Sequence, residues 1–230
     1  MKLSTRLHTI FDMVQPCGVA ADIGCDHGLL PIALIQSGKC EHVYACDVRK
    51  GPLSRAQEAI RQYGLQNSIT TKLCDGLQGL EDDVEVVVIA GMGYDTICRI
   101  LMKGDKQLKH YKQIILQCNT RVEDMRRWLH QNGFTIDAEQ LVKDHHYYQM
   151  LSVHKEPSDM REDQYLFGVY LDRHPLFKEY WTYILEKQKI IIQHTQPHHD
   201  GYAAAVEKIK TIEKKLKELD YIPVPFLVRL

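Results

Sequence analysis

Residues 19–28 read Val-Ala-Ala-Asp-Ile-Gly-Cys-Asp-His-Gly, and this stretch decides the fold. Residues 19–23 form a short, mostly apolar run of the kind found in buried strands, and a helical pattern begins directly after Gly28. Glycines in a turn between a strand and a helix let the backbone approach a ligand at the helix N-terminus. The stretch therefore predicts a strand, a ligand-binding loop and a helix, in that order.

Outward from this loop, short β-rich runs alternate with helical patterns up to about residue 155. Such alternation is typical of a parallel sheet with crossover helices. The expected strands cover residues 19–23, 42–46, 68–74, 84–90 and 113–117, and the expected helices cover residues 29–36, 52–63, 96–102 and 122–131. Residues 86–89 are apolar throughout, so the strand that contains them is expected at the centre of the sheet.

Two further β-like segments, residues 134–141 and 147–153, follow so closely on one another that they predict an antiparallel pair. A dinucleotide-binding domain would normally add a helix and a parallel strand at this point. The sequence therefore predicts an α/β, Rossmann-like domain with a mostly parallel, seven-stranded sheet over residues 1–156.

The pattern changes at residues 156–159, where a polar segment with a proline ends the alternation. Apolar residues then recur at helical spacing between residues 175 and 219, with a break at residues 196–202. We expect a second domain over residues 157–230, built as an α-helical coiled-coil hairpin.

The composition is that of an ordinary globular protein, with 44% hydrophobic and 26% charged residues. No segment resembles a membrane span, and the N-terminus lacks the apolar core of a signal peptide, so a cytoplasmic location is expected. The seven cysteines include no Cys-x-x-Cys pair and are expected to be reduced thiols. Because the net charge is −1, binding of a nucleic acid would require a local basic patch.

The loop composition distinguishes between nucleoside cofactors. A dinucleotide fingerprint has a glycine where this chain has Asp26, and a carboxylate there would repel a pyrophosphate. Two carboxylates, Asp22 and Asp26, instead suit a ligand that carries an ammonium and a sulfonium group. The sequence thus favours S-adenosyl-L-methionine, with Asp22, Gly24, Asp26, His27 and Gly28 around it.

Other candidate cofactor residues follow the next strands. Asp47, with Val48 beside it, ends the second strand, where an acid binds both ribose hydroxyls of a nucleoside. Asp75 and Gly76 follow the third strand, where the carboxylate can accept from the adenine amino group, although an Asp-Gly pair also forms turns by itself. The fourth strand leads into Ala90, Gly91 and Met92, which complete the predicted cofactor site.

The candidate substrate residues are Arg6, Gly93, Tyr94 and Asn119. The Asn/Asp-Pro-Pro-Tyr/Phe clamp of many amino-methylating enzymes is absent after the fourth strand. The glycines leave room for a flat base, and Tyr94 can stack on it or belong to a plain turn. Asn119 can pair with a base edge or cap the following helix.

The clustered histidines at residues 145–146 and 198–199 do not predict a metal site. Neighbouring residues on a strand point to opposite faces, and neither cluster has a second pair at zinc-like spacing. No metal is expected.

Several motifs over nearly the whole chain resemble those of the bacterial TrmK-type tRNA (adenine-N1)-methyltransferases, which modify the adenine at position 22 of tRNA. They lie at residues 3–7, 21–27, 51–53, 74–77, 89–93, 116–119 and 127–129. The segments Ile-Ala-Gly-Met-Gly and Leu-Gln-x-Asn are the specific ones. Two positions depart from the family, because Cys118 stands where a proline is common and Tyr94 where a further glycine is frequent.

The resemblance implies a class I methyltransferase fold with a C-terminal helical hairpin, and methyl transfer from S-adenosyl-L-methionine to N1 of adenine 22. Asp26 and Asn119 are the candidate catalytic residues, and Asp26 can serve the cofactor, the reaction or both. The hairpin lysines are candidate tRNA contacts, although interspersed glutamates are also typical of ordinary solvated helices. A small-molecule or protein methyltransferase and a non-catalytic cofactor-binding regulator remain alternatives. Neither a membrane nor an obligate protein partner is expected.

Overall fold

The computed structural model describes residues 2–199 and 201–220. The chain divides into two compact units, residues 1–172 and residues 173–230. The boundary therefore lies later than the expected one after residue 156, and residues 157–172 belong to the first unit. Residues 221–230 of the expected second domain lie outside the described residues.

The first unit is built around one seven-stranded sheet with the order β3-β2-β1-β4-β5-β7-β6. The strands are β1 (Cys17–Ile23), β2 (Cys40–Asp47), β3 (Ile69–Leu73), β4 (Val86–Met92), β5 (Gln113–Cys118), β6 (Thr135–Asp144) and β7 (His146–His154). Pairing is parallel from β3 through β5, and β7 runs antiparallel to both β5 and β6. The predicted Rossmann-like sheet with its closing antiparallel pair is confirmed.

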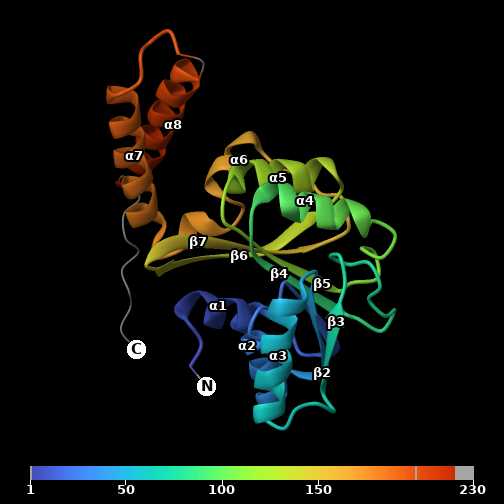
Figure 1. Cartoon of the computed structure of the whole chain (residues 1–230). Coiled ribbons are helices and arrows are strands. Elements are labelled where there is room, and N and C mark those ends of the chain that lie inside the picture. Colours follow the sequence, from blue (N-terminus) through green and yellow to red (C-terminus); the bar gives the residue numbers. More distant parts are fainter. Residues whose placement is uncertain (1, 200, 221–230) are drawn as a thin grey trace, which may run out of the picture. The chain divides into compact units, whose positions relative to one another are not determined.

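Helices cover both faces of this sheet (Figure 1). The elements are α1 (Thr5–Met13), α2 (Leu29–Gln36), α3 (Lys50–Gln62), α4 (Tyr94–Lys103), α5 (Val122–Gln131), α6 (Glu162–Phe167) and the 3-10 helix η1 (Leu171–Arg173). Residues of α1, α2 and α3 pack on one face, and residues of α4 and α5 pack on the other. The four expected helices are confirmed, whereas α1 and α6 were not assigned from the sequence.

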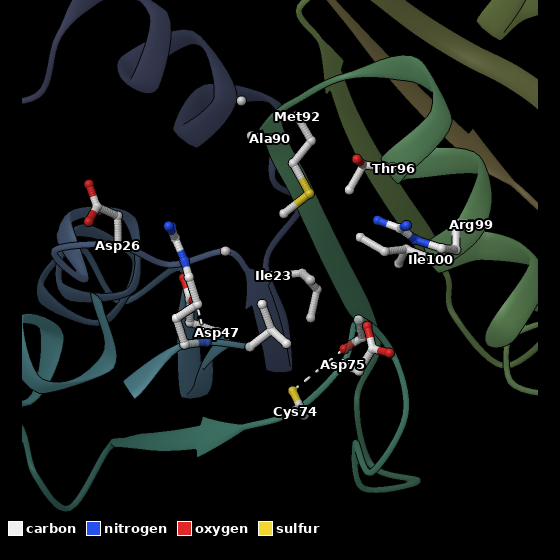
Figure 2. A pocket seen from close by; sticks show the side chains of 15 residues that line it. Ile23, Asp26, Asp47, Cys74, Asp75, Ala90, Met92, Thr96, Arg99 and Ile100 are labelled. Atoms are coloured by element: carbon white, nitrogen blue, oxygen red, sulfur yellow. Dashed lines mark hydrogen bonds and ion pairs between the residues drawn. The ribbon is translucent and has the colours of Figure 1, made fainter. Parts of the chain in front are cut away.

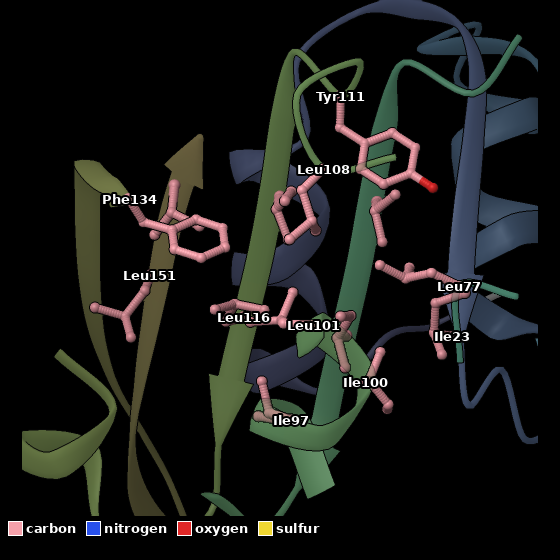
Figure 3. Packing of buried hydrophobic residues seen from close by; sticks show 14 of the residues in the cluster. Ile23, Leu77, Ile97, Ile100, Leu101, Leu108, Tyr111, Leu116, Phe134 and Leu151 are labelled. Atoms are coloured by element: carbon pink, nitrogen blue, oxygen red, sulfur yellow. The ribbon is translucent and has the colours of Figure 1, made fainter. Parts of the chain in front are cut away.

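The central strand β4 shows why the sheet is covered on both sides. Val87 and Ile89 lie in the core with α4 and α5, and Val86 and Val88 lie in the core with α1 and α2. All four side chains are buried, as their unbroken apolar run predicts. Figure 3 shows the first of these cores, in which Leu101 of α4, Leu116 of β5 and Phe134 lie close together.

A buried ion pair explains why residues 157–172 belong to the first unit. Arg126 of α5 donates from Nε to Glu139 Oε1 of β6 at 2.7 Å, and both side chains are almost fully buried. Arg126 Nη1 also donates to the Tyr165 carbonyl, and Glu139 Oε2 accepts from the backbone N–H groups of Val169 and Tyr170. Because buried charges need partners, the pair fastens the segment after β7 to the sheet.

The second unit contains the helices α7 (Phe177–Gln193) and α8 (Tyr202–Asp220), which pack against each other. Ion pairs join Lys178 to Asp220 at 2.5 Å and Lys189 to Glu213 at 2.7 Å, so the two helices run antiparallel. The expected helical hairpin is therefore present. Among the helices that the structure describes, none is both long and apolar enough to span a bilayer.

Candidate functional site

The carboxyl ends of the parallel strands surround a pocket of about 420 Å³ (Figure 2). Ligands of open α/β sheets bind at this edge. The lining residues are Ile23, Gly24, Asp26, Asp47, Val48, Arg49, Cys74, Asp75, Gly76, Ala90, Gly91, Met92, Thr96, Arg99 and Ile100. Nine of the twelve predicted cofactor residues are among them, so the structure brings these nine together at one site.

A smaller pocket of about 140 Å³ adjoins the first and shares Gly24, Asp26 and Ala90 with it. Its wall adds Arg6, Asp22 and His27, among others. The predicted cofactor residues Asp22 and His27 and the predicted substrate residue Arg6 therefore lie next to the main pocket.

The loop after β1 depends on its glycines. Gly24 has φ +84°, and a Cβ atom there would lie 2.6 Å from Met92 Cε. Gly28 also has a positive φ, but it lines neither pocket, and a Cβ atom there would approach Ala56 of α3 to 3.3 Å. Gly24 thus shapes the pocket floor, whereas Gly28, a predicted cofactor residue, allows α2 and α3 to pack closely.

Asp22 is the most strongly perturbed acid of the site. It is 7% exposed, and burial, reinforced by the charge of Asp47 and opposed by Arg6, raises the pKa of Asp22 to about 7. Among the residues that the structure describes, none donates a hydrogen bond to this carboxylate. A buried carboxylate without a donor beside a pocket is suited to a cationic group of a ligand.

Asp47 and Asp75 stand at the ends of neighbouring strands. Asp47 is buried and its Oδ1 accepts from the backbone N–H of Arg49 at 2.8 Å, while Val48 beside it is exposed. Asp75 is half exposed and pairs with Lys103 of α4 at 2.5 Å, which lowers the pKa of Asp75. Both carboxylates line the pocket and can accept hydrogen bonds from a ligand there.

Asp26 occupies the outer side of the loop. Its carboxylate pairs with Arg55 of α3 at 2.8 Å and lies 3.6 Å from His27 Nε2, and its side chain is largely exposed. Asp26 also has φ +41°, an uncommon value for a residue other than glycine. A residue held in this way and shared by both pockets can face either the cofactor or a second substrate.

Arg6 and Asn119, which are far apart in sequence, are joined by the buried side chain of Gln117. Arg6 Nη1 donates to Gln117 Oε1 at 2.7 Å, and Gln117 Nε2 donates to Asn119 Oδ1 at 2.9 Å. Gln117 was not predicted from the sequence. A polar residue directly after the apolar run 114–116 of β5, two positions before Asn119, was the available signal.

The predicted stacking residue Tyr94 is partly covered. It begins α4 after Gly93, packs against the core, and carries the Arg121 guanidinium over its ring at 4.3 Å. Neither Tyr94 nor Gly93 lines the two pockets. The expected stacking of a base on Tyr94 therefore gains no support from this arrangement.

Helix α4 contributes lining residues that were not predicted from the sequence. Thr96, Arg99 and Ile100 reach the pocket opposite Asp47, as Figure 2 shows. Their spacing of three and four residues places these side chains on one face of the helix, and this spacing was the available signal.

Across residues 2–199 and 201–220, no three His, Cys, Asp or Glu side chains gather in a way that could hold a metal ion.

Comparisons with known proteins agree with this geometry. A family model described as a methyltransferase domain matches residues 3–151. A tRNA (adenine(22)-N(1))-methyltransferase of Bacillus subtilis is 30% identical over 222 residues, which are 95% of this chain and 93% of the relative.

Two solved structures of similar proteins contain ligands. A Streptococcus pneumoniae protein, described as a putative tRNA (m1A22) methyltransferase in complex with S-adenosyl-L-methionine, is 31% identical with a TM-score of 0.86 and covers 94% of this chain and 100% of its own. M. capricolum TrmK in complex with S-adenosyl-homocysteine is 30% identical with a TM-score of 0.84, covering 94% and 99%. The chain therefore belongs to the methyltransferase domain family and, within it, to the tRNA (adenine(22)-N1)-methyltransferases.

Proposed function

We propose that this protein transfers a methyl group from S-adenosyl-L-methionine to N1 of adenine 22 in tRNA. The observation that carries the proposal is the buried carboxylate of Asp22, which accepts no hydrogen bond from the residues that the structure describes and lies next to a glycine loop at the carboxyl edge of the sheet. This site has the charge that a cationic amino-acid group requires. We expect the reaction to take place in the cytoplasm, without a metal or a membrane.

We expect the acids around the pocket to contact different parts of the cofactor. Asp22 would bind the ammonium group, Asp47 would bind the ribose hydroxyls, and Asp75 would accept from the adenine amino group through the oxygen that Lys103 leaves free. The backbone at Gly24 and Gly91 lets the reacting end approach closely. The cofactor supplies an electrophilic methyl group on sulfur.

The residues of the chain then act mainly by position and charge. An adenine that has left its helix presents its N1 lone pair to the methyl group, and alignment of the two provides most of the acceleration. Methylation at N1 makes the base cationic. Asp26, exposed at the border of the two pockets, stabilises this charge or accepts a proton from the amino group.

Nucleoside analysis tests the proposal directly. Incubation with labelled cofactor and total bacterial tRNA, followed by digestion, is expected to yield 1-methyladenosine. Absence of transfer to RNA would refute the proposal: transfer to a small molecule or protein would identify a different enzyme, and cofactor binding without any transfer would identify a regulator.

Replacement of Asp26 by asparagine separates its two roles. If Asp26 stabilises the developing charge, Asp26→Asn lowers kcat by about 100-fold, a usual size for such a group. Single-turnover methylation and calorimetric binding of S-adenosylhomocysteine measure the two roles independently. Normal turnover would eliminate the catalytic role, and a loss confined to binding would assign Asp26 to the cofactor alone.

The hairpin lysines are expected to contact tRNA phosphates. Changing Lys214 and Lys217 to glutamine should weaken tRNA binding by about tenfold. The slope of the logarithm of the binding constant against the logarithm of the salt concentration should become shallower by roughly one for each lost contact. The matched control changes Lys106 and Lys109, which precede β5 in the first unit. Equal losses in the two variants, measured by filter binding across salt concentrations, would contradict a specific role of the hairpin.

A further inference from the structure

A bulge interrupts the pairing of β4 with β5 beside the cofactor pocket. The register shifts between Ala90 and Met92, and Gly91 between them has φ +75°. A bulge leaves ladder groups without partners. Here the Gly91 N–H donates to Gln117 Oε1 at 3.0 Å, and the Gly91 carbonyl accepts from Asn119 Nδ2 at 2.8 Å. Two side-chain amides therefore replace the missing ladder bonds.

The orientation of both amides follows from groups that can only donate or only accept. The Arg6 guanidinium and the Gly91 N–H are donors, so the atom of Gln117 that they share must be its oxygen. The nitrogen of Gln117 then donates to Asn119, whose oxygen must face it. The Asn119 nitrogen in turn faces the Gly91 carbonyl, which is an acceptor. Every link fixes the next.

This network leaves both a donor and an acceptor of the Asn119 side chain unused. A primary amide has two N–H donors and two oxygen lone pairs, and the network uses one of each on Asn119. Gln117 is fully buried, whereas Asn119 is exposed. The Asn119 backbone N–H also donates to the carbonyl of Met92, which lines the pocket. Asn119 itself lines neither pocket, but it is hydrogen-bonded to Gly91 and Met92, which do, so its side chain offers one donor and one acceptor to a base beside the pocket.

We propose that Asn119 selects adenine through its N6 amino group and N7, and that Gln117 and Arg6 are positioning residues that fix the Asn119 amide. The inference rests on the proposed function. N1 must stay uncovered to receive the methyl group, which leaves the N6 and N7 edge for recognition. Asparagine binds this edge of adenine with two hydrogen bonds. Guanine presents two acceptors there, so a fixed Asn119 oxygen would face the O6 of guanine.

The test uses a tRNA in which the target adenine is replaced by 7-deazaadenine, which lacks the N7 acceptor. The wild-type protein should methylate this tRNA with a kcat/KM about 10-fold to 100-fold lower than unmodified tRNA. The variant Asn119→Ala should be slower on unmodified tRNA by a similar factor and show no further loss on the deaza tRNA. Its affinity for S-adenosylhomocysteine, measured by calorimetry, should change less than twofold.

Gln117→Glu tests the positioning role. Its carboxylate still accepts from Arg6 and Gly91 but presents an oxygen to Asn119, so the Asn119 amide must turn. This variant should also lose its sensitivity to the deaza substitution, and near-ultraviolet circular dichroism should confirm its fold. Should it fail to fold, Asn119→Ala carries the test alone.

Two results separate this inference from the proposed function. Equal rates of the wild-type protein on the two tRNAs, or a full deaza effect in Asn119→Ala, would overturn the role of Asn119 while 1-methyladenosine formation still stands. Absence of 1-methyladenosine in unmodified tRNA would instead remove the proposed function.

Discussion

Replacing Asp22 by asparagine is expected to weaken binding of S-adenosylhomocysteine by about 100-fold or more, because the buried ammonium group loses its charged partner. The matched control is Asp75→Asn, which changes a half-exposed carboxylate of the same pocket that already pairs with Lys103. We expect the Asp75→Asn variant to lose less than tenfold in affinity for S-adenosylhomocysteine. Calorimetric titration of both variants makes the comparison. Equal losses would show that Asp22 has no special role.

The pH dependence of the same binding has a defined sign. Burial raises the pKa of Asp22 to about 7, so the carboxylate is charged above that pH and becomes neutral below it. Affinity of the wild-type protein for S-adenosylhomocysteine should therefore be highest between about pH 7 and pH 8, and fall as the pH drops from 7 to 5.5. The Asp22→Asn profile should be flat over this range.

The stability of the ligand-free protein should depend on pH in the opposite direction to the affinity for the ligand. Between about pH 4 and pH 7 the folded state holds a proton on Asp22 that the unfolded chain has lost, so the free energy of unfolding decreases as the pH rises. Above pH 7 Asp22 is charged in both states, and its burial lowers the free energy of unfolding by a constant amount. Asp22→Asn removes this effect and should stabilise the ligand-free protein by about 2 kcal/mol at pH 8. Urea unfolding at pH 4 and pH 8 measures the difference, which should nearly vanish at pH 4.

The largest effect on stability is expected from Arg126→Met. This change leaves Glu139 buried without its partner and should lower the free energy of unfolding by about 3–5 kcal/mol. The neighbouring change Arg127→Met is a close control, because Arg127 forms a partly exposed pair with Glu162 and should cost less than about 1 kcal/mol. Urea denaturation at pH 7 compares the two variants. A loss no greater for Arg126→Met than for Arg127→Met would contradict the role of the buried pair.

A truncation extends this prediction to the unit boundary. A chain that ends at residue 156 lacks the Tyr165 carbonyl and the Val169 and Tyr170 N–H groups that bind the ion pair. It should unfold at lower urea than a chain that ends at residue 172, where these groups are retained. Equal midpoints would place the boundary where the sequence pattern changes.

Local patterns were sufficient to predict most of the first unit. The apolar run at residues 86–89 indicated a central strand because a strand buried on both faces cannot alternate. The glycine turn after residue 23 and the acids at strand ends indicated a nucleoside site because parallel strands present their carboxyl ends at one edge. These inferences depend on neighbouring residues and on a topology with few alternatives.

Hairpin formation was predictable, but the buried side of its first helix was not. The buried apolar residues of α7 are Phe177, Trp181 and Leu185, while Tyr183, Ile190 and Ile191 of the same helix are exposed. Several apolar residues per turn give a helix more than one possible buried face. Only the packing of the folded unit selects one.

The sequence by itself determined most strands and helices of the first unit, the glycine loop and the acids that line the pocket, because each depends on residues close together along the chain. Only the tertiary structure decided which of these residues act together. It buried Asp22 and raised its pKa, covered Tyr94 with Arg121, and joined Arg6 to Asn119 through Gln117. Burial and long-range hydrogen bonds set pKa values and amide orientations, and neither leaves a periodic signal in a sequence.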